Sequence, residues 1–286
     1  MSKVIIVGNG PAGISAALYT ARANIETTVI GNGYGALGKA EKIENYYGFA
    51  EPIDAKTLVE NGIAQAKHAG VTILEDEVVG IQYNGRLAVQ TKSAQLEADY
   101  VLLATGASRA TPKIPGLKEL EGHGVSYCAI CDAFFYRGKD VAVLGSGDYA
   151  MHEAMELLPV VGSVTILTNG AELTAPLPEG AKVDTRKISA FTGNGIVEQV
   201  VFEDGSSLAI SGVFVAVGVA GSADLAKKLG AATEGNKILV NDKMQTNIPG
   251  LYAAGDCIGG LLQIAKAVSD GAVAGTSIVA EIRKKK

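Results

Sequence analysis

The sequence predicts an α/β protein of two domains with the same plan, the second inserted in the first. Two stretches carry this prediction, KVIIVGNGPAGISAALYTA at residues 3–21 and KDVAVLGSGDYAMHEAMEL at residues 139–157. Each contains a short β-branched strand, a glycine turn and a helix whose small residues face the strand. A second pair, YVLLATGAS at 100–108 and GVFVAVGVA at 212–220, adds a buried strand that ends in glycine. Strands that alternate with helices indicate parallel sheets, and hence two Rossmann-like domains in a three-layer ββα arrangement.

The end of the chain is expected to belong with its beginning. The segment NIPGLYAAGDCIGG, residues 247–260, and the Gly- and Ala-rich helix after it do not make a third unit, so they are assigned to the first domain. The predicted first domain is 1–109 with 238–286, the second is 110–237, and the chain crosses between them near 108–112 and 237–242.

Composition excludes several classes of protein. A chain of 286 residues can bury two modest cores, and its net charge of −5 argues against nucleic acid as a partner. Its longest apolar run, VFVAVGVAG, is far shorter than the ~20 residues of a membrane span. The apolar run at the start is too short for the core of a signal peptide. Three cysteines do not make a disulfide framework. We therefore expect a cytoplasmic protein with no membrane or nucleic-acid partner.

The first glycine turn has the spacing of a dinucleotide site. Gly8 permits the tight turn, Gly10 lets the backbone approach a pyrophosphate, and Gly13 lets helix and strand pack closely. The helix that follows presents unpaired N–H groups and the positive end of its dipole. Ile30 and Gly31 stand where an NAD-binding unit has an acidic residue, but the strand–turn–helix context still predicts a dinucleotide here.

The second glycine turn is altered. It keeps Gly145 and Gly147, with Ala150 in the third position, but Tyr149 is expected to point a large ring to where a phosphate needs room. The next strand ends in Leu-Thr-Asn-Gly, residues 167–170. These residues offer neither the carboxylate that binds an NAD ribose nor the cations that bind the NADP phosphate.

Two prolines add to this difference. Pro176 and Pro178 lie where a crossover helix is expected, and proline breaks helices. The sequence therefore predicts that the second domain is a scaffold that has kept its fold and lost its nucleotide.

The segment GVSYCAICDAFFYRG contains the candidate chemistry. Cys128 and Cys131 form a CxxC at a predicted helix start, where the dipole and nearby donors lower a thiol pKa and favour thiol–disulfide exchange. Asp132, directly after, is a candidate proton donor or acceptor for that exchange. Zinc would need four ligands, and the sequence has no second CxxC, while His123 lies upstream and Cys257 is far away, so the missing ligands argue against zinc. An inert buried pair is the other alternative, and Cys257 is interpreted as a small core residue.

At this point the chain resembles a known family over nearly its whole length. The segments GNGPAG, IENYYG, LLATGAS, CAICDAFFYRGK, VFVAVG and IPGLYAAGD occur in the order found in low-molecular-weight thioredoxin reductases. The resemblance implies two domains of the FAD/NAD(P)-binding type, FAD in the first domain, thioredoxin as a partner and a homodimer. It also implies that Cys131 faces the flavin, that Cys128 attacks the thioredoxin disulfide, and that Asp132 is the acid.

The resemblance further implies which residues hold FAD. The pyrophosphate lies on the first glycine turn, the adenosine lies near Val78 and the turn at 104–106, and the isoalloxazine lies near Asn45. The full set is Gly8, Gly10, Pro11, Ala12, Gly13, Asn45, Val78, Ala104, Thr105, Gly106, Gly255, Asp256, Gln263, Ile264 and Ala265.

The chain departs from the NADPH-using members of that family. Residues 167–169 replace a histidine and two arginines, Tyr149 replaces a serine or threonine, and Leu262 replaces an arginine before Gln263. A further arginine lies, in those members, on the helix that the prolines interrupt here. This pattern resembles the ferredoxin-linked flavin thioredoxin reductases, in which electrons arrive singly from reduced ferredoxin. The departures therefore predict ferredoxin as the electron donor.

Three alternatives stay open from the sequence. The first is a thioredoxin reductase that uses NADPH or NADH through an atypical pocket. The second is a redox sensor that carries a flavin and a dithiol without turnover. The third is an oxidoreductase whose dithiol serves another acceptor, such as a peroxiredoxin-like protein.

Overall fold

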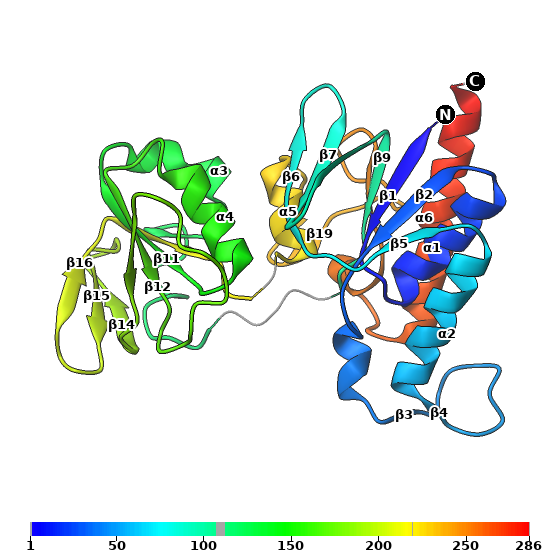
Figure 1. The fold of residues 1–286 in the computed structure, drawn as a ribbon, viewed down its shortest axis with the longest axis horizontal. Coiled ribbons are helices and arrows are strands. Elements are labelled where there is room, and N and C mark those ends of the chain that lie inside the picture. Colours follow the sequence, from blue (N-terminus) through cyan, green and yellow to red (C-terminus); the bar gives the residue numbers. More distant parts are fainter. Residues whose placement is uncertain (1, 107–111, 219, 286) are drawn as a thin grey trace. The chain divides into compact units, whose positions relative to one another are not determined.

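The computed structural model describes residues 2–106, 112–218 and 220–285, and the chain divides into two compact units. The first unit is Met1–Ser108 with Gly221–Lys286, and the second unit is Arg109–Ala220. Each unit has a five-stranded parallel sheet and a separate three-stranded antiparallel sheet (Figure 1). The predicted class, two Rossmann-like α/β domains with the second inserted in the first, is confirmed.

The first unit is built on a parallel sheet of order β20-β9-β1-β2-β5. Figure 1 shows α1, α2 and α6 on one side of this sheet and the β6-β7-β8 sheet on the other. The elements are β1 (Lys3–Val7), α1 (Pro11–Arg22), β2 (Glu26–Ile30), η1 (Gly35–Lys39), β3 (Lys42–Ile43), β4 (Ile53–Asp54), α2 (Ala55–His68), β5 (Thr72–Leu74), β6 (Val78–Tyr83), β7 (Leu87–Thr91), β8 (Gln95–Ala98), β9 (Tyr100–Leu103), α5 (Ser222–Lys228), β18 (Thr233–Glu234), β19 (Lys237–Ile238), β20 (Leu251–Ala253), η3 (Gly255–Ile258) and α6 (Ile264–Lys284).

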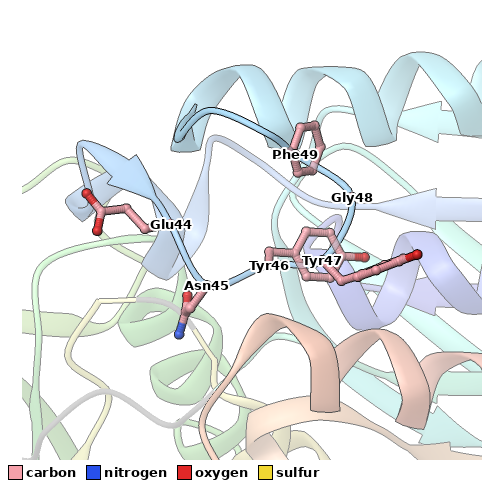
Figure 2. A pocket seen from close by; sticks show the side chains of 6 residues that line it. All are labelled: Glu44, Asn45, Tyr46, Tyr47, Gly48 and Phe49. Carbon is pink, nitrogen blue, oxygen red and sulfur yellow. The ribbon is translucent and has the colours of Figure 1, made fainter.

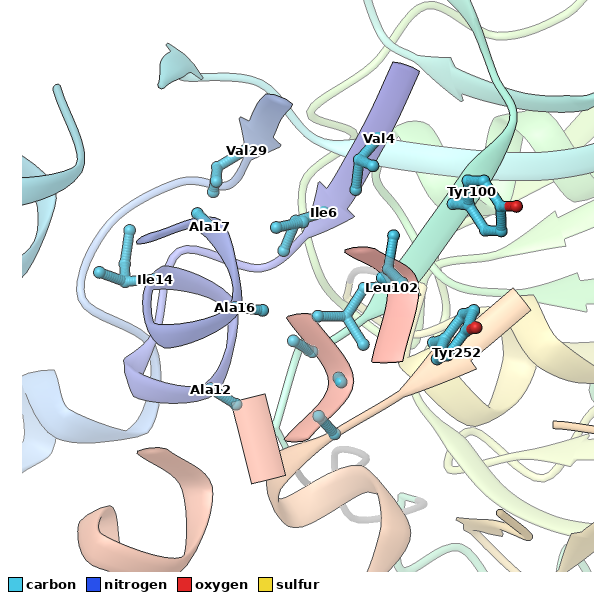
Figure 3. Packing of buried hydrophobic residues seen from close by; sticks show 14 of the residues in the cluster. Val4, Ile6, Ala12, Ile14, Ala16, Ala17, Val29, Tyr100, Leu102 and Tyr252 are labelled. Carbon is cyan, nitrogen blue, oxygen red and sulfur yellow. The ribbon is translucent and has the colours of Figure 1, made fainter. Parts of the chain in front are cut away.

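The core of the first unit lies between this sheet and its helices (Figure 3). The inward side chains of β1 and β9, such as Ile6 and Leu102, meet small residues of α1 such as Ala16. α6 then packs directly on α1, because a Cβ on Gly271 would lie 2.1 Å from the carbonyl oxygen of Ala12. Small residues at these positions therefore fix the start of α1 beside the sheet and α6.

The second unit repeats the plan with one element missing. Its parallel sheet has the order β10-β17-β11-β12-β13. Its elements are β10 (Val125–Ser126), α3 (Ala129–Asp132), η2 (Ala133–Tyr136), β11 (Asp140–Leu144), α4 (Asp148–Leu157), β12 (Ser163–Leu167), β13 (Ala181–Asp184), β14 (Ile188–Thr192), β15 (Gln199–Phe202), β16 (Ser207–Ala209) and β17 (Gly212–Val215). Between β12 and β13 the described chain forms no helix, as the two prolines predict.

The boundary between the units differs from the expected one at one end. Residues 221–237, assigned from sequence to the inserted domain, belong to the first unit. α5 packs on β6, and β19 packs on η3. The hydroxyls of Thr105 and Ser222 are 2.7 Å apart, and each accepts a hydrogen bond from the backbone N–H of the other residue. These contacts anchor the chain to the first unit at residue 222, well before the expected crossing at 237–242. The other expected crossing, 108–112, falls almost wholly outside the described residues.

No helix in the described part of the chain is long and apolar enough to span a bilayer.

Candidate functional site

The first glycine turn has the geometry of a dinucleotide cradle. Gly8 has a φ of +118°, and a Cβ there would lie 2.3 Å from the carbonyl oxygen of Ala104 at the end of β9. A Cβ on Gly13 would lie 1.9 Å from the carbonyl oxygen of Gly8, so α1 and the turn touch. Gly10 is the opposite case, because a Cβ on Gly10 would meet no atom within 4 Å. The turn is thus closely packed at Gly8 and Gly13, on the side of β9 and α1, and open at Gly10, where a pyrophosphate needs room.

The start of α1 favours an anion at this open side. Pro11 occupies the first turn, where its missing N–H costs nothing and its φ suits the helix. The first turn contains no acidic residue, so the positive end of the helix dipole is not neutralised from within α1. Ala12 is buried beneath it and lies against Gly255, whose Cβ would come 2.9 Å from that of Ala12. The predicted pyrophosphate residues and the η3 turn therefore meet at one place.

Other predicted cofactor residues lie around this turn. Thr105 and Gly106 follow β9, which pairs in parallel with β1 and so ends beside the turn. Asp256 lies in η3, and burial raises the pKa of its carboxyl, with the nearby Lys266 ammonium opposing that rise. Val78 is buried at the start of β6, in the antiparallel sheet.

A second group of predicted residues meets at the loop after β3. The Nδ2 of Asn45 donates to the Oε1 of Gln263 over 2.9 Å, although the two residues are 218 positions apart in the chain. Gln263 caps α6, whose first residues are the predicted Ile264 and Ala265. Asn45 lines a shallow hollow made by residues 44–49 (Figure 2). The structure therefore brings Asn45, expected near the isoalloxazine, together with Gln263, expected to complete the cofactor site.

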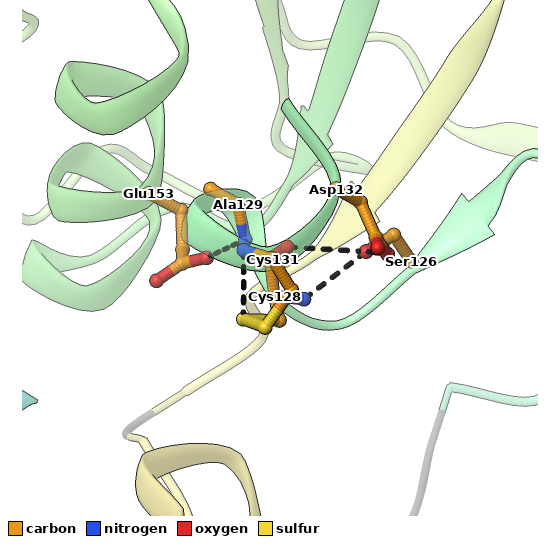
Figure 4. Close-up of a disulfide and its surroundings, with 6 residues drawn as sticks. All are labelled: Ser126, Cys128, Ala129, Cys131, Asp132 and Glu153. Atoms are coloured by element: carbon orange, nitrogen blue, oxygen red, sulfur yellow. Dashed lines mark hydrogen bonds between the residues drawn. A yellow bond between two sulfur atoms is a disulfide. The ribbon is translucent and has the colours of Figure 1, made fainter. Parts of the chain in front are cut away.

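Cys128 and Cys131 form a disulfide at the start of α3 (Figure 4). Cys128 is the N-cap of this helix, and its Sγ accepts the backbone N–H of Cys131 at 3.3 Å. Cys128 is 5% exposed, whereas Cys131 is exposed at the surface. The CxxC therefore lies at the start of a helix, as predicted. Cys131 is accessible to an incoming group, while the sulfur of Cys128 accepts a hydrogen bond from a backbone N–H of the helix.

Asp132 is held beside the pair by a residue that the sequence analysis missed. The hydroxyl of Ser126, in β10, donates to Oδ2 of Asp132 over 2.7 Å and accepts the N–H of Cys128 at 3.1 Å. Asp132 is thereby linked through one hydroxyl to the backbone of Cys128. Burial, with a smaller contribution from the charge of Asp132, raises the pKa of Tyr136. No sequence spacing marks Ser126, which precedes the motif on a two-residue strand.

The second glycine turn keeps the close packing of the first. A Cβ on Gly145 would lie 2.2 Å from the carbonyl oxygen of Ala216, just as Gly8 meets Ala104. The side that corresponds to the open side of Gly10 differs. There the backbone N–H of Thr174 donates to the carbonyl oxygen of Ser146 over 2.9 Å, and the Thr174 hydroxyl donates to the same oxygen at 3.3 Å. The Oγ1 of Thr174 would lie 3.4 Å from a Cβ on Gly147. The loop after β12 therefore covers this turn.

Tyr149 does not take the position expected for it. The ring predicted to crowd the phosphate region is 2% exposed and buried in the interior of the second unit. Tyr149 lies in the first turn of α4, where the six consecutive residues 149–154 are all buried, so its ring is enclosed with the rest of this helix start. The crowding comes from Thr174 instead, and Asp148 adds an acidic residue to the first turn of the same helix.

The end of β12 is also occupied by its own chain. The N–H of Thr168 donates to the carbonyl oxygen of Asp184, and Oδ1 of Asn169 accepts the N–H of Ile188 at 2.7 Å. Arg186, a nearby cation, forms ion pairs with Asp184 and with Asp204. Asn169 and Arg186 are therefore engaged with the loops of the second unit. The Thr168 hydroxyl is buried without a hydrogen-bond partner among the described residues, and the Lys187 side chain lies against Gly170.

Comparison with known proteins assigns the class. The sequence profile of the family described as "Pyridine nucleotide-disulphide oxidoreductase" matches residues 2–271. Thioredoxin reductase of Peptoclostridium acidaminophilum is 36% identical over 95% of this chain and 94% of its own, and that of Bacillus subtilis is 34% identical over 96% and 93%. The chain therefore belongs to the thioredoxin reductases within the pyridine nucleotide-disulphide oxidoreductase family.

Solved structures agree with this assignment. The atypical thioredoxin reductase TRi from Desulfovibrio vulgaris Hildenborough is 40% identical, with a TM-score of 0.93 over 99% of each chain. A ferredoxin-flavin thioredoxin reductase from Clostridium acetobutylicum is 31% identical, with a TM-score of 0.73 over 99% of this chain and 98% of that one. The protein is thus a flavin oxidoreductase of the thioredoxin reductase type with a cysteine pair.

FAD is the cofactor of this family and of this chain. The residues of the first unit fit it, because the space above Gly10 is open and the α1 start is free of acidic side chains. The second glycine turn, under Thr174 and beside Asp148, lacks both features.

Proposed function

We propose that the protein reduces thioredoxin through FAD and the Cys128–Cys131 pair, with electrons from reduced ferredoxin in place of NADPH. The covered second glycine turn is the observation that carries this proposal. A nicotinamide dinucleotide would rest its pyrophosphate on that turn, where Thr174 is hydrogen-bonded to Ser146. The solved ferredoxin-flavin thioredoxin reductase from Clostridium acetobutylicum matches nearly the whole chain, so a chain of this fold is described with a ferredoxin donor.

The charge around this turn opposes the same ligand. Asp148 places a carboxylate in the first turn of α4, at the helix end where an anionic pyrophosphate would need positive potential. At the end of β12, the nearby Arg186 is paired with two carboxylates. Three features therefore disfavour NADPH at the second glycine turn. Thr174 covers the turn, Asp148 adds a negative charge to the first turn of α4, and the charge of Arg186 is already paired.

We infer that FAD lies in the first unit. Its pyrophosphate would be held by Gly8, Gly10 and the start of α1, and its isoalloxazine would lie near Asn45 and Gln263. The open side of Gly10 and the Asn45–Gln263 hydrogen bond support this placement. Bound FAD supplies the ability to collect single electrons and pass them on in pairs.

The cysteine pair is proposed to act in a fixed order. Two electrons delivered at the exposed Cys131 sulfur break the S–S bond, and Cys128 leaves as a thiolate. The N–H of Cys131 already points at that sulfur, so the leaving thiolate is stabilised. Cys128 then attacks one sulfur of the thioredoxin disulfide to form a mixed disulfide, and Asp132, held by Ser126, provides the proton that the departing thioredoxin thiol needs. Cys131 next attacks the Cys128 sulfur, which re-forms the Cys128–Cys131 disulfide and releases the second thioredoxin thiol.

The energetics allow this route. Ferredoxins near about −400 mV and thioredoxin near about −270 mV differ by about 130 mV, or about 6 kcal/mol for two electrons. The overall transfer is downhill without NADPH.

Turnover with defined donors tests the proposal. The oxidised protein, thioredoxin and either reduced ferredoxin or NADPH are mixed without oxygen, and free thioredoxin thiols are counted with time. We expect thiols to accumulate with ferredoxin and to stay at background with NADPH. Turnover with NADPH alone would support the nicotinamide-dependent alternative, and no turnover with either donor would support a redox sensor. The homodimer stays a prediction, which light scattering of the purified protein tests.

A further inference from the structure

Glu153 is a buried carboxylate on the inner face of α4. It is 1% exposed, and it shares that face with Ala150, Ala154 and Leu157, which are completely buried. The spacing of these four residues is that of one apolar helix face. A purely structural position there would take an aliphatic side chain, because burying a carboxylate is costly unless it is hydrogen-bonded.

The partner of Glu153 lies in the redox motif. Its Oε2 accepts the backbone N–H of Ala129 at 2.8 Å, and Ala129 is the first residue of α3, directly after Cys128. α3 packs against α4, so this bond joins the two helices at the end that carries the disulfide. Figure 4 shows Glu153 on one side of the α3 turn, with Ser126 and Asp132 on the other.

The Glu153–Ala129 hydrogen bond affects how well the start of α3 can stabilise a thiolate of the Cys128–Cys131 pair. The N–H groups at a helix start stabilise thiolates and so favour the reduced form of a CxxC. Here the Cys131 N–H points at the Cys128 sulfur, but the Ala129 N–H is bound to a carboxylate. That side chain takes up one donor, and in its ionised form it also adds a negative charge near the pair; both effects disfavour a thiolate. A pair whose reduced form is less stabilised has a more negative potential and is a stronger reductant.

We propose that Glu153 is a positioning residue that fixes the first turn of α3 and keeps the Cys128–Cys131 dithiol strongly reducing. The inference rests on the proposed role of this pair as the donor to thioredoxin. In that step the dithiol loses two electrons and two protons and becomes the disulfide, and the thioredoxin disulfide gains both. In this proposal Glu153 acts through its hydrogen bond to the backbone of Ala129.

The test measures the disulfide equilibrium of the whole flavoprotein with dithiothreitol. Wild type, Glu153→Gln and Glu156→Gln are equilibrated without oxygen over a range of reduced-to-oxidised dithiothreitol ratios. The free thiols are then alkylated, and mass spectrometry of the peptide that contains Cys128 and Cys131 gives the fraction of the pair in the dithiol form. Glu156→Gln is the matched control, because it removes from the same helix a carboxylate that lies 4.0 Å from Nε2 of His152 and leaves the Glu153–Ala129 hydrogen bond in place.

We expect Glu153→Gln to shift the equilibrium constant about tenfold toward the dithiol, a potential about 30 mV less negative. Glu156→Gln should stay within about twofold of wild type. Glu153→Met, of similar length and without charge, should shift the constant in the same direction and replaces the glutamine variant if that variant does not fold.

A constant within about twofold of wild type in the Glu153 variants, or a shift toward the disulfide, would overturn the proposal. Neither ferredoxin nor thioredoxin takes part in this equilibrium. A failure here is therefore distinct from a failure of the proposed function, which the turnover assay detects.

Discussion

The two glycine turns of this chain share a close contact with the neighbouring strand and differ in their surroundings. Gly8 lies against the carbonyl oxygen of Ala104, and Gly145 lies against that of Ala216 in the same way. Above Gly10 there is open space, whereas Thr174 is hydrogen-bonded across the second turn. The helix after the first turn starts with proline and has no acid in its first turn, and the helix after the second starts with an aspartate.

This difference teaches that the turn belongs to the fold and the ligand depends on what surrounds it. The close contact of a glycine with the neighbouring strand is needed to join strand and helix, with or without a nucleotide. Binding needs free space above the turn and an unneutralised helix end. The first unit has the free space and the unneutralised helix end, whereas the second unit lacks them and contains the cysteine pair.

The largest expected effect comes from the cysteine pair, which on this account is the whole contribution of the second unit to the chemistry. Cys128→Ser should lower thioredoxin reduction by at least about 10³-fold, because no thiolate remains to attack the partner disulfide. Reduction of the flavin by ferredoxin should continue, which the loss of its visible absorption band measures. Full thioredoxin reduction by this variant would remove the dithiol from the mechanism.

A matched pair of bulky substitutions then separates the two turns. Gly10→Phe fills the open side of the first turn, so FAD affinity should fall at least about 100-fold, equivalent to about 2.8 kcal/mol. Gly147→Phe makes the same change on the covered turn and should leave FAD content unchanged. Flavin absorbance per protein after gel filtration measures both. Equal retention of FAD in the two variants would contradict the placement of the cofactor in the first unit.

Restoring cations at the strand end should have little effect. Thr168→Arg with Asn169→Arg adds two charges where NADP-binding units carry them, but Thr174 still covers the turn and Asp148 still repels a pyrophosphate. Flavin reduction by NADPH should stay within about twofold of wild type in stopped-flow traces. Fast reduction in the double variant would show that charge alone separates the two turns.

The smallest effect concerns the loop that covers the second turn. Thr174→Ala keeps the backbone hydrogen bond to Ser146 and loses the hydroxyl one, so the free energy of unfolding in urea should fall by about 0.5 kcal/mol. Thr174→Ser keeps the hydroxyl and serves as the control. Ferredoxin-driven thioredoxin reduction should be the same in both variants.

The sequence predicts the parts of this comparison that are local. Glycine spacing predicts both turns, the two prolines predict the missing crossover helix, and the CxxC predicts a pair at a helix start. Thr174 could not be found in this way, because it meets Ser146 from 28 positions away through a loop without periodicity. The same holds for the end of the second unit at Ala220, since the pattern of α5 does not say which sheet that helix covers.

The rest of the site could not be fully predicted from the sequence, because the sequence does not give the direction in which a side chain points. Tyr149 is bulky in sequence, but its ring lies in the interior, so its size does not block a ligand. Glu153 carries the one signal that could have revealed it, a carboxylate on an otherwise apolar helix face. The Asn45–Gln263 contact needed the family resemblance, since two amides 218 residues apart share no local pattern.

Anaerobic stopped-flow reduction of the bound flavin tests the central claim most directly. The oxidised protein is mixed in parallel with NADPH and with reduced ferredoxin, and the visible flavin band is followed. The contrast between the two glycine turns predicts rapid bleaching with ferredoxin and an unchanged band with NADPH. Bleaching by NADPH as fast as by ferredoxin would show that the second turn still holds a nicotinamide nucleotide, and would contradict the account.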